Sequence, residues 1–174
     1  MSEIDQQIEA MAIQARAAAL QISQLSGDEK NRILASMAVA LRESATELIE
    51  ANAHDLANAE KKQLAPAMLD RLRLDEGRIE AMASGIEQVV HLPDPVGEVM
   101  QAWERPNGMK LEQVRVPIGT IGIIYESRPN VTSDAAVLCL KAGNATILRG
   151  GSEAIHSNRA IAEVLTRGGM AVGM

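Results

Sequence analysis

The stretch Ile118–Asn158, IGTIGIIYESRPNVTSDAAVLCLKAGNATILRGGSEAIHSN, decides the fold of this chain. Its first apolar run, Thr120–Tyr125, is short and rich in β-branched residues, which is typical of a strand buried on both faces. The run Val131–Leu140 is long enough for a helix of about three turns, and Gly143 after it predicts a C-cap. Ala145–Leu148 is a second short strand, so the stretch predicts strand, helix and strand in that order.

Polar residues gather in the two loops that follow these predicted strands. Glu126–Asn130 follows the first strand, and Arg149–Glu153 follows the second and leads into a new helix. Two parallel strands joined by a crossover helix place both loops at the same carboxyl edge of a sheet. Because open α/β sheets bind their ligands at that edge, we expect the functional residues in these loops.

Three motifs in this stretch carry a resemblance to a known family. YESRPNVT, LCLKAGNA and ILRGGSEAIHSN, which start at Tyr125, Leu138 and Ile147, resemble the γ-glutamyl phosphate reductase family of the aldehyde dehydrogenase superfamily. Several motifs in one order are far more specific than a lone Gly-Gly-Ser. The similarity continues upstream through residues 49–56, 67–72 and 92–97 and covers nearly the whole chain.

The resemblance implies an α/β fold of the aldehyde dehydrogenase type with three parts. These are a helical amino-terminal part (1–95), a β-hairpin arm of the oligomerisation type (96–116) and the start of a Rossmann-like NADP-binding unit (117–174). The family is considerably longer than 174 residues. We therefore expect the chain to match its amino-terminal part, without the catalytic domain that carries the nucleophilic cysteine.

The family activity implied by this resemblance is the NADPH-dependent reduction of L-glutamyl 5-phosphate to L-glutamate 5-semialdehyde, with phosphate release, in proline biosynthesis. A thiolate displaces phosphate to give a thioester, and hydride transfer then leads to the aldehyde. We expect an NADP-dependent oxidoreductase as the parent enzyme and no activity in these residues alone. One alternative is a non-catalytic module that binds NADP or self-associates. A dehydrogenase of free aldehydes is a third, although YESRPN replaces the PWNFP-like loop usual in the superfamily.

The second loop supplies the candidate cofactor residues Arg149, Gly151, Ser152 and Glu153. Glycine lets a ligand approach the backbone, and a hydroxyl and a carboxylate at a helix start bind a ribose or cap the helix. The resemblance places this loop beside the adenosine half of NADP, with the charge of Arg149 suited to a 2′-phosphate. The G-x-G-x-x-G fingerprint is missing, but aldehyde dehydrogenases do not use it. The alternative is ordinary capping by Ser152 or Glu153.

The first loop supplies the candidate catalytic and substrate-binding residues. By resemblance, Asn130 is the asparagine whose amide helps to hold the oxyanion of the reaction, a role that suits an amide donor. The alternative for Asn130 is an N-cap. Arg128 is a candidate for binding the phosphate or carboxylate of the substrate, and an ion-pair partner within the loop is equally compatible with the sequence.

Other reactive residues lack a pattern that points to chemistry. Cys139 lies among apolar residues in mid-helix, so we expect a buried, inert thiol. His54, His91 and His156 are far apart in sequence and have no cysteine or carboxylate at ligand spacing, so no metal site is expected.

Composition narrows the class of partner. The net charge of −6, from 17 basic and 23 acidic residues, argues against a general nucleic-acid binder. One Trp, one Tyr and no Phe leave no stacking platform for bases. The single cysteine fits a reducing compartment. Without a secretory signal or an apolar run of about 20 residues, a cytoplasmic protein without a membrane span is expected. By resemblance it is a homo-oligomer.

The first part of the chain has a helical pattern. Apolar residues recur at helix spacing from Ile8 to Ile22, and Ser26 with Glu29 has the spacing of a capping box before a second helix to about Ala51. Asn52–Glu60 either continues that helix or forms its own. The remaining predicted elements are a helix over Pro66–Leu72, a helix capped by Asp75, and strands over Val96–Trp103 and Met109–Val116 around the turn Arg105–Gly108.

Overall fold

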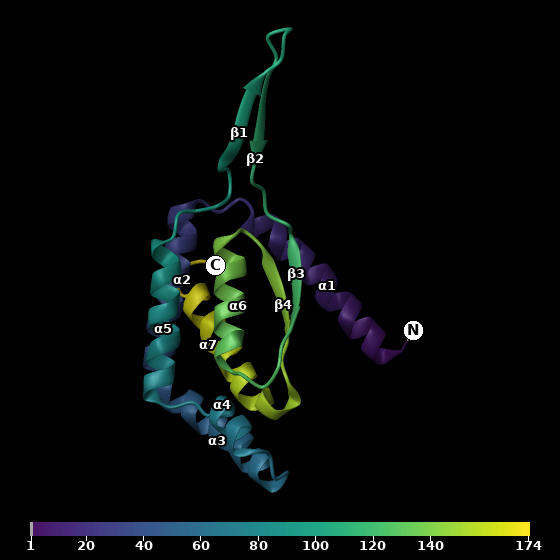
Figure 1. Cartoon of the computed structure of the whole chain (residues 1–174). Helices are drawn as coiled ribbons and strands as arrows, with labels where there is room; N and C mark the ends of the chain where they lie inside the picture. The colour runs from purple at the N-terminus through teal and green to yellow at the C-terminus, as the bar shows by residue number, and fades with distance from the viewer. Residues whose placement is uncertain (1) are drawn as a thin grey trace.

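The computed structural model describes residues 2–174 as a helical body, a two-stranded parallel sheet and a hairpin arm that stands away from the body (Figure 1). None of the helices described combines the length and the apolarity that a membrane span requires. The helices are α1 (Glu3–Ile22), α2 (Gly27–Glu43), α3 (Ala45–Lys61), α4 (Pro66–Leu72), α5 (Glu76–His91), α6 (Asn130–Lys141) and α7 (Ile155–Met170), with a 3-10 turn η1 (Ser152–Ala154). The strands are β1 (Val99–Glu104), β2 (Lys110–Val114), β3 (Thr120–Ile124) and β4 (Ala145–Arg149).

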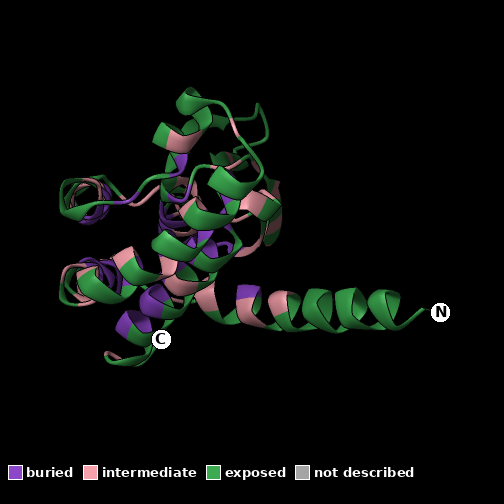
Figure 2. Ribbon diagram, turned by 90° about the horizontal axis from the view of Figure 1, so that it is seen from below, coloured by how far each residue is buried: buried purple, intermediate pink, exposed green. Residues whose placement is uncertain are grey.

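Helices α2, α3, α5, α6 and α7 contribute to the main hydrophobic core of the body. Helix α2 packs against α5 and α7, and α6 packs against α5. Leu34 and Ile79, which precede the hairpin, share this core with Val137 and Ile161, which follow it. In Figure 2 the buried residues lie on the inner faces of the body. The division of the chain at residues 95 and 117 stays a prediction, since both sides contribute to one core.

Helix α1 is mostly outside this core. It extends away from the body in Figure 2, and only its carboxyl-terminal end contacts the sheet. Ala19 is buried near that end, whereas Ile8, on the same predicted apolar face, is 60% exposed. The helix spacing of the sequence is therefore confirmed, but burial of the whole face is not.

The helix starts follow the capping chemistry of the sequence. The Glu29 backbone N–H donates to Ser26 Oγ (3.3 Å), and the Ser26 N–H donates back to Glu29 Oε2 (2.8 Å), which confirms the predicted capping box. Asp75 Oδ1 accepts a bond from the Arg78 N–H (2.8 Å) and caps α5 as predicted. Pro66 opens α4, where its missing N–H costs nothing.

The prediction that the second helix runs to Ala51 is wrong. Ser44 leaves the helical conformation (φ −98°, ψ 14°) and separates α2 from α3. Because of this break, α3 turns onto α7 and α4 and adds Leu48 to the core of the body. Spacing alone could not show the break, because apolar residues recur at helical intervals on both sides of it.

The hairpin arm is formed by β1 and β2, which pair antiparallel. Arg105–Gly108 forms the predicted turn: the Gly108 N–H donates to the Arg105 carbonyl (2.9 Å), and Gly108 has a φ of +83°, which favours glycine. The strands are shorter than predicted, because pairing begins at Val99 and ends at Val114. Trp103 on the arm is 45% exposed.

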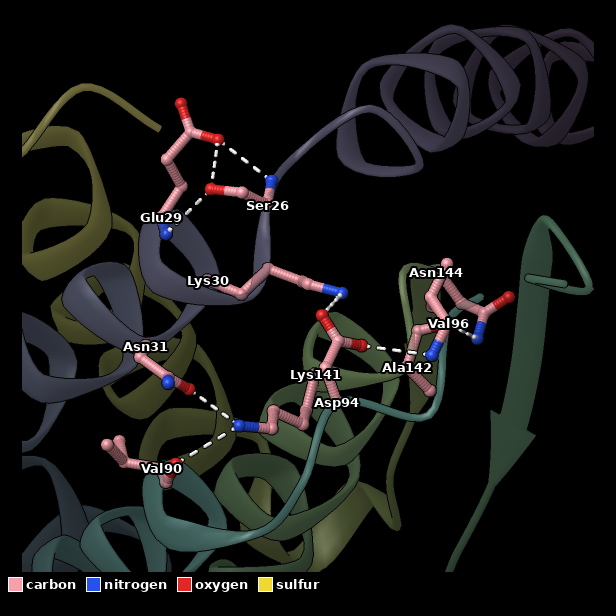
Figure 3. Close-up of polar contacts among 10 residues, drawn as sticks. All are labelled: Ser26, Glu29, Lys30, Asn31, Val90, Asp94, Val96, Lys141, Ala142 and Asn144. Carbon is pink, nitrogen blue, oxygen red and sulfur yellow. Dashed lines mark hydrogen bonds and ion pairs between the residues drawn. The ribbon is translucent and has the colours of Figure 1, made fainter. Parts of the chain in front are cut away.

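A buried polar cluster holds the base of the arm to the body (Figure 3). Lys30 on α2 is 1% exposed and pairs with Asp94, which precedes the arm, at 2.5 Å. Asp94 also accepts a bond from the Val96 backbone N–H (3.0 Å). Lys141 on α6 donates to Asn31 Oδ1 (2.6 Å) and to the Val90 carbonyl, and burial lowers its pKa. The ion pair between Lys30 and Asp94 thus fixes the start of the arm to α2 of the body.

The parallel pair β3 and β4, connected by α6, confirms the predicted strand–helix–strand order. The prediction that the first strand is buried on both faces is wrong: Ile121 and Ile123 are half-buried, and Ile124 is 78% exposed. The β-branched composition indicated a strand correctly, but exposure depends on which elements cover the sheet.

Gly143 ends α6 as predicted. It has a φ of +76°, and the next residue, Asn144, donates its N–H to the Cys139 carbonyl (2.8 Å). A Cβ at Gly143 would lie 2.8 Å from Pro117 Cγ. Both the left-handed backbone and the lack of space therefore require glycine here.

Candidate functional site

The two predicted loops meet at the carboxyl ends of β3 and β4. The Tyr125 N–H donates to the Arg149 carbonyl (3.0 Å), and Ser127 Oγ donates to Glu153 Oε2 (2.8 Å). Parallel strands end at the same edge, so residues 26 positions apart in sequence become hydrogen-bonding partners. The sequence placed these loops correctly, although it did not single out Ser127.

The second loop approaches its surroundings so closely that a Cβ at either glycine would displace neighbouring side chains. A Cβ at Gly150 would lie 2.2 Å from Asn158 Nδ2 and 3.0 Å from the Tyr125 ring. A Cβ at Gly151 would lie 2.8 Å from both Ser127 Oγ and Glu153 Oε2. The pair of glycines thus lets the loop lie directly on the first loop and on α7.

A hydrogen-bonded chain supports the loops from below. Tyr125 Oη and Thr132 Oγ1 are 2.6 Å apart, and Thr132 Oγ1 donates to Asn158 Oδ1 (3.0 Å). Thr132 and Asn158 are buried. These contacts link β3, α6 and α7 beneath the edge of the sheet.

The predicted alternative of capping by Ser152 or Glu153 is wrong. The N-cap residues of η1 and α7 are Gly151 and Ala154, and no side chain at these positions accepts a backbone N–H. Glu153 instead accepts the bond from Ser127, and Ser152 Oγ donates to Glu153 Oε1 (3.3 Å). A bond from its own backbone N–H and the bond from Ser127 lower the pKa of Glu153. The Glu153 carboxylate is therefore charged and is fixed between the two loops by the bond from Ser127.

Helix α7 is capped by Asp55, a residue on α3. Asp55 accepts bonds from the His156 N–H (3.2 Å), from the Ser157 N–H (2.7 Å) and from Ser157 Oγ (2.7 Å). Asn52, one turn earlier, donates to Ser157 Oγ (2.9 Å) and to the Leu72 carbonyl (2.8 Å). We call Asn52, Asp55 and Ser157, all buried, the cap network.

The cap network fixes the start of α7 directly after the glycine loop. Sequence analysis did not identify these residues. Two polar side chains three positions apart on one helix face are equally typical of a solvated surface. Only the position of α3 against α7 shows that this face is buried.

Asn130 is the first residue of α6, but it is not the N-cap. Pro129 holds that position, so the capping alternative for Asn130 is wrong. The Asn130 amide donates to Asp134 Oδ2 (3.0 Å), one turn further along the helix. Burial raises the pKa of Asp134, with the Asn130 bond as a smaller, opposing effect. The oxyanion role of Asn130 stays a prediction.

Two hollows lie on either side of Arg128. The first, of about 420 Å³, is lined by Asn130, Asp134 and arginines from α4, α5 and the segment between them. The second, of about 490 Å³, is lined by Ser127, Arg149, Gly151 and Glu153. We call the second hollow the glycine-loop hollow. Arg128 lines both hollows, so it stands at their boundary.

Cys139 is buried in α6 and 8% exposed, which confirms the expected burial, and the inertness of its thiol stays a prediction. His54 and His156, far apart in sequence, lie with ring centroids 5.7 Å apart. Among residues 2–174, no group of three His, Cys, Asp or Glu side chains has an arrangement that could hold a metal ion.

Comparison with known proteins shows which family the chain belongs to. Residues 2–174 match the aldehyde dehydrogenase family. The chain belongs to the aldehyde dehydrogenase family. The resemblance of its motifs and its predicted α/β fold are thereby confirmed.

Named relatives within this family refine the comparison. The γ-glutamyl phosphate reductase of Geobacter metallireducens is 57% identical over 162 residues, which are 93% of this chain and 39% of that protein. The crystal structure of γ-glutamyl phosphate reductase from Thermotoga maritima has a TM-score of 0.88 and 43% identity, covering 90% of this chain and 38% of its own. The Saccharomyces cerevisiae enzyme of the same name has a TM-score of 0.85 and 37% identity over 97% of this chain and 42% of its own. The chain thus spans about two fifths of the length of these relatives.

Proposed function

We propose that this chain is the amino-terminal part of an NADP-dependent γ-glutamyl phosphate reductase. The parent enzyme reduces L-glutamyl 5-phosphate to L-glutamate 5-semialdehyde and releases phosphate, in the synthesis of L-proline. The identity of 57% with a relative of that name, over nearly the whole chain, carries the proposal. The meeting of the two loops at one sheet edge supports it, because such edges hold dinucleotides.

The glycine-loop hollow is the proposed site for the adenosine half of NADP(H). A Cβ at Gly150 or Gly151 would crowd neighbouring side chains. Arg149 and the charged carboxylate of Glu153 both line the hollow. In this proposal Glu153 and Ser152 bond the ribose, and the guanidinium of Arg149 binds the 2′-phosphate. These residues fit the cofactor chemically, and bound NADPH would supply the hydride.

The first loop is the proposed site of the reacting group. One N–H of the Asn130 amide is bonded to Asp134, which orients the amide and leaves its second N–H to donate to an oxyanion. Arg128, at the boundary of the two hollows, is the proposed ligand of the substrate phosphate or carboxylate. The burial of Cys139 supports the proposal that it is not the nucleophile and that the chain alone is inert.

The proposed reductase is tested on the product of the native gene. Its intact mass is measured first, and a value well above 18.6 kDa is expected. The purified protein is then given L-glutamate 5-semialdehyde, phosphate and NADP⁺, and NADPH formation is followed by absorbance. Formation that requires both the aldehyde and phosphate supports the proposal, and formation without phosphate, or none, contradicts it.

The Arg149→Gln variant tests the cofactor assignment in the same assay. Loss of the guanidinium is expected to raise the KM for NADP⁺ about tenfold and to leave the KM for NAD⁺ nearly unchanged. An equal change for both cofactors would remove Arg149 from the 2′-phosphate site.

The second candidate function is a non-catalytic module that binds NADP or self-associates. The arm favours it, because Met100, Trp103 and Met109 are about half exposed on a hairpin that stands away from the body. A cytoplasmic homo-oligomer that pairs through the arm is compatible with both functions. A native gene product of about 18.6 kDa that binds NADPH without turnover would favour the module.

A further inference from the structure

The hollow beside the glycine-loop hollow is rich in arginine. Its volume of about 420 Å³ lies in the range of small-molecule sites. We call it the arginine pocket and define it by residues from the α4–α5 region and from the start of α6. Its charged and amide-bearing lining residues are Asp70, Arg71, Arg73, Arg78, Arg128, Asn130 and Asp134.

One of these arginines has a structural partner. Arg78 pairs with Asp70 at 2.9 Å and donates to the Arg73 carbonyl (2.8 Å). It thereby fixes the segment between α4 and α5. Its charge is compensated by a carboxylate of the same chain, so it adds little to the attraction of a ligand.

The other three arginines differ. Within residues 2–174, the exposed guanidinium groups of Arg71, Arg73 and Arg128 have no hydrogen bond or ion pair, whereas that of Arg78 in the same pocket does. Three like charges around one pocket repel each other unless an anion lies between them. Planar guanidinium groups bind carboxylates through two parallel hydrogen bonds.

The pocket also contains one carboxylate without a cation. Asp134 lies on its wall, and its described polar contact is the Asn130 amide (3.0 Å). A pocket with several arginines and one unpaired aspartate matches a ligand that carries both signs of charge. An α-amino acid head group has this combination, with its carboxylate and ammonium on one carbon.

We propose that the arginine pocket binds the α-amino-acid end of the substrate, with its carboxylate on Arg71 and Arg73 and its ammonium on Asp134. The assignment of a glutamyl compound rests on the proposed reductase function. Arg71 and Arg128 line both hollows, so the γ-acyl end of the same molecule would lie at the boundary with the glycine-loop hollow. Arg73 and Asp134 then determine substrate specificity, because they bind the α-carboxylate and the α-ammonium, which are not part of the reacting group.

The proposal is tested by binding, without cofactor and without turnover. The ¹⁵N-labelled chain is titrated with L-glutamate, and amide shifts are followed by NMR. Changes are expected at the backbone of Leu72–Leu74 and Val131–Asp134. Glutarate, which lacks the ammonium, is expected to bind about tenfold more weakly, since it loses one charge-assisted contact.

Two variants separate the charges of the ligand. Arg73→Gln is expected to weaken L-glutamate and glutarate alike, by about tenfold. Asp134→Asn is expected to weaken L-glutamate to the level of glutarate and to leave glutarate unchanged. Arg105→Gln, an equal change in the turn between β1 and β2, is the matched control and is expected to change neither affinity. The amide spectrum of each free variant reports whether it is folded.

Three results would overturn the proposal. The first is equal affinity for L-glutamate and glutarate, and the second is equal binding of inorganic phosphate at the same amides, which would indicate a simple anion site. The third is the lack of any shift change with L-glutamate. The assay of the proposed reductase is independent of this binding test. If the gene product binds L-glutamate but has no reductase activity, the amino-acid site is supported and the proposed reductase function is contradicted.

Discussion

The cap network and the arginine pocket are both polar, but they differ in where their partners come from. Asn52, Asp55 and Ser157 are buried and bond to one another and to backbone groups of the chain. In the arginine pocket, Arg73 and Arg128 are exposed and have no partner within residues 2–174. Buried polar groups must be satisfied within the protein, whereas partnerless charges in an open hollow are available to a ligand. The cap network stabilises the fold, whereas the charges of the arginine pocket are available to bind a ligand.

The largest expected effect comes from removing the centre of the cap network. Asp55→Ala leaves the N–H groups of His156 and Ser157 and the Ser157 hydroxyl without their acceptor. The free energy of unfolding is expected to fall by about 4 kcal/mol, measured by urea denaturation followed by circular dichroism. Asp28→Ala, an exposed aspartate in the first turn of α2, is the control, with an expected loss below about 1 kcal/mol. Equal losses in both variants would contradict the role of the network.

A slightly smaller loss is expected at the base of the arm. Asp94→Ala leaves Lys30, which is 1% exposed, without its counterion. The expected destabilisation is about 3 kcal/mol by the same measurement, because an unpaired buried charge is costly. The double variant Asp94→Ala with Lys30→Met is expected to regain part of the loss. A double variant no more stable than the single one would show that the charge of Lys30 is not the cause.

An exposed ion pair gives a smaller effect that depends on pH. Bonds from Arg42 and then from Ser84 lower the pKa of Glu80 from 4.5 to about 2. A carboxylate with a lowered pKa in the folded state stabilises the fold above pH 4.5, and this contribution is lost as the pH falls toward 2. The melting temperature of Glu80→Gln is therefore expected to fall less between pH 5 and pH 2 than that of the unchanged protein. Parallel curves for the two proteins would show that the pair contributes nothing.

The smallest effect on stability is expected in the arginine pocket itself. Arg73→Gln and Arg128→Gln remove charges that have no partner, so the free energy of unfolding should change by less than about 0.5 kcal/mol, or rise slightly. Urea denaturation in low salt checks this. A loss of about 2 kcal/mol would mean that these side chains serve the fold, and the contrast with the cap network would disappear.

The sequence predicted those features that depend on local chemistry. The Ser26–Glu29 capping box, the cap at Asp75, the turn at Gly108 and the helix end at Gly143 are all determined by residues within a few positions of each other. The order of strand, helix and strand followed from apolar run lengths. The loops at the sheet edge followed from the direction of parallel strands.

Features that depend on distant contacts were missed. Neither the break at Ser44, the exposure of Ile124 nor the capping of α7 by Asp55 has a local signal. The arginine pocket was found only in part: Arg128 and Asn130 were identified from their loop, but Arg73 and Asp134 were not. Their meeting depends on the packing of α5 against α6, which no spacing in the sequence reveals.

The cap network also bears on the order in which the molecule forms. The bond from Ser157 to Asp55 joins residues 102 positions apart, and that from His156 spans 101. Contacts of such separation form slowly, because a long chain segment must close before they stabilise anything. During synthesis α3 leaves the ribosome before α7, so the Asp55 carboxylate has none of these hydrogen-bonding partners until α7 has been made. We therefore expect the glycine loop to acquire its shape late in folding, when the start of α7 docks on α3.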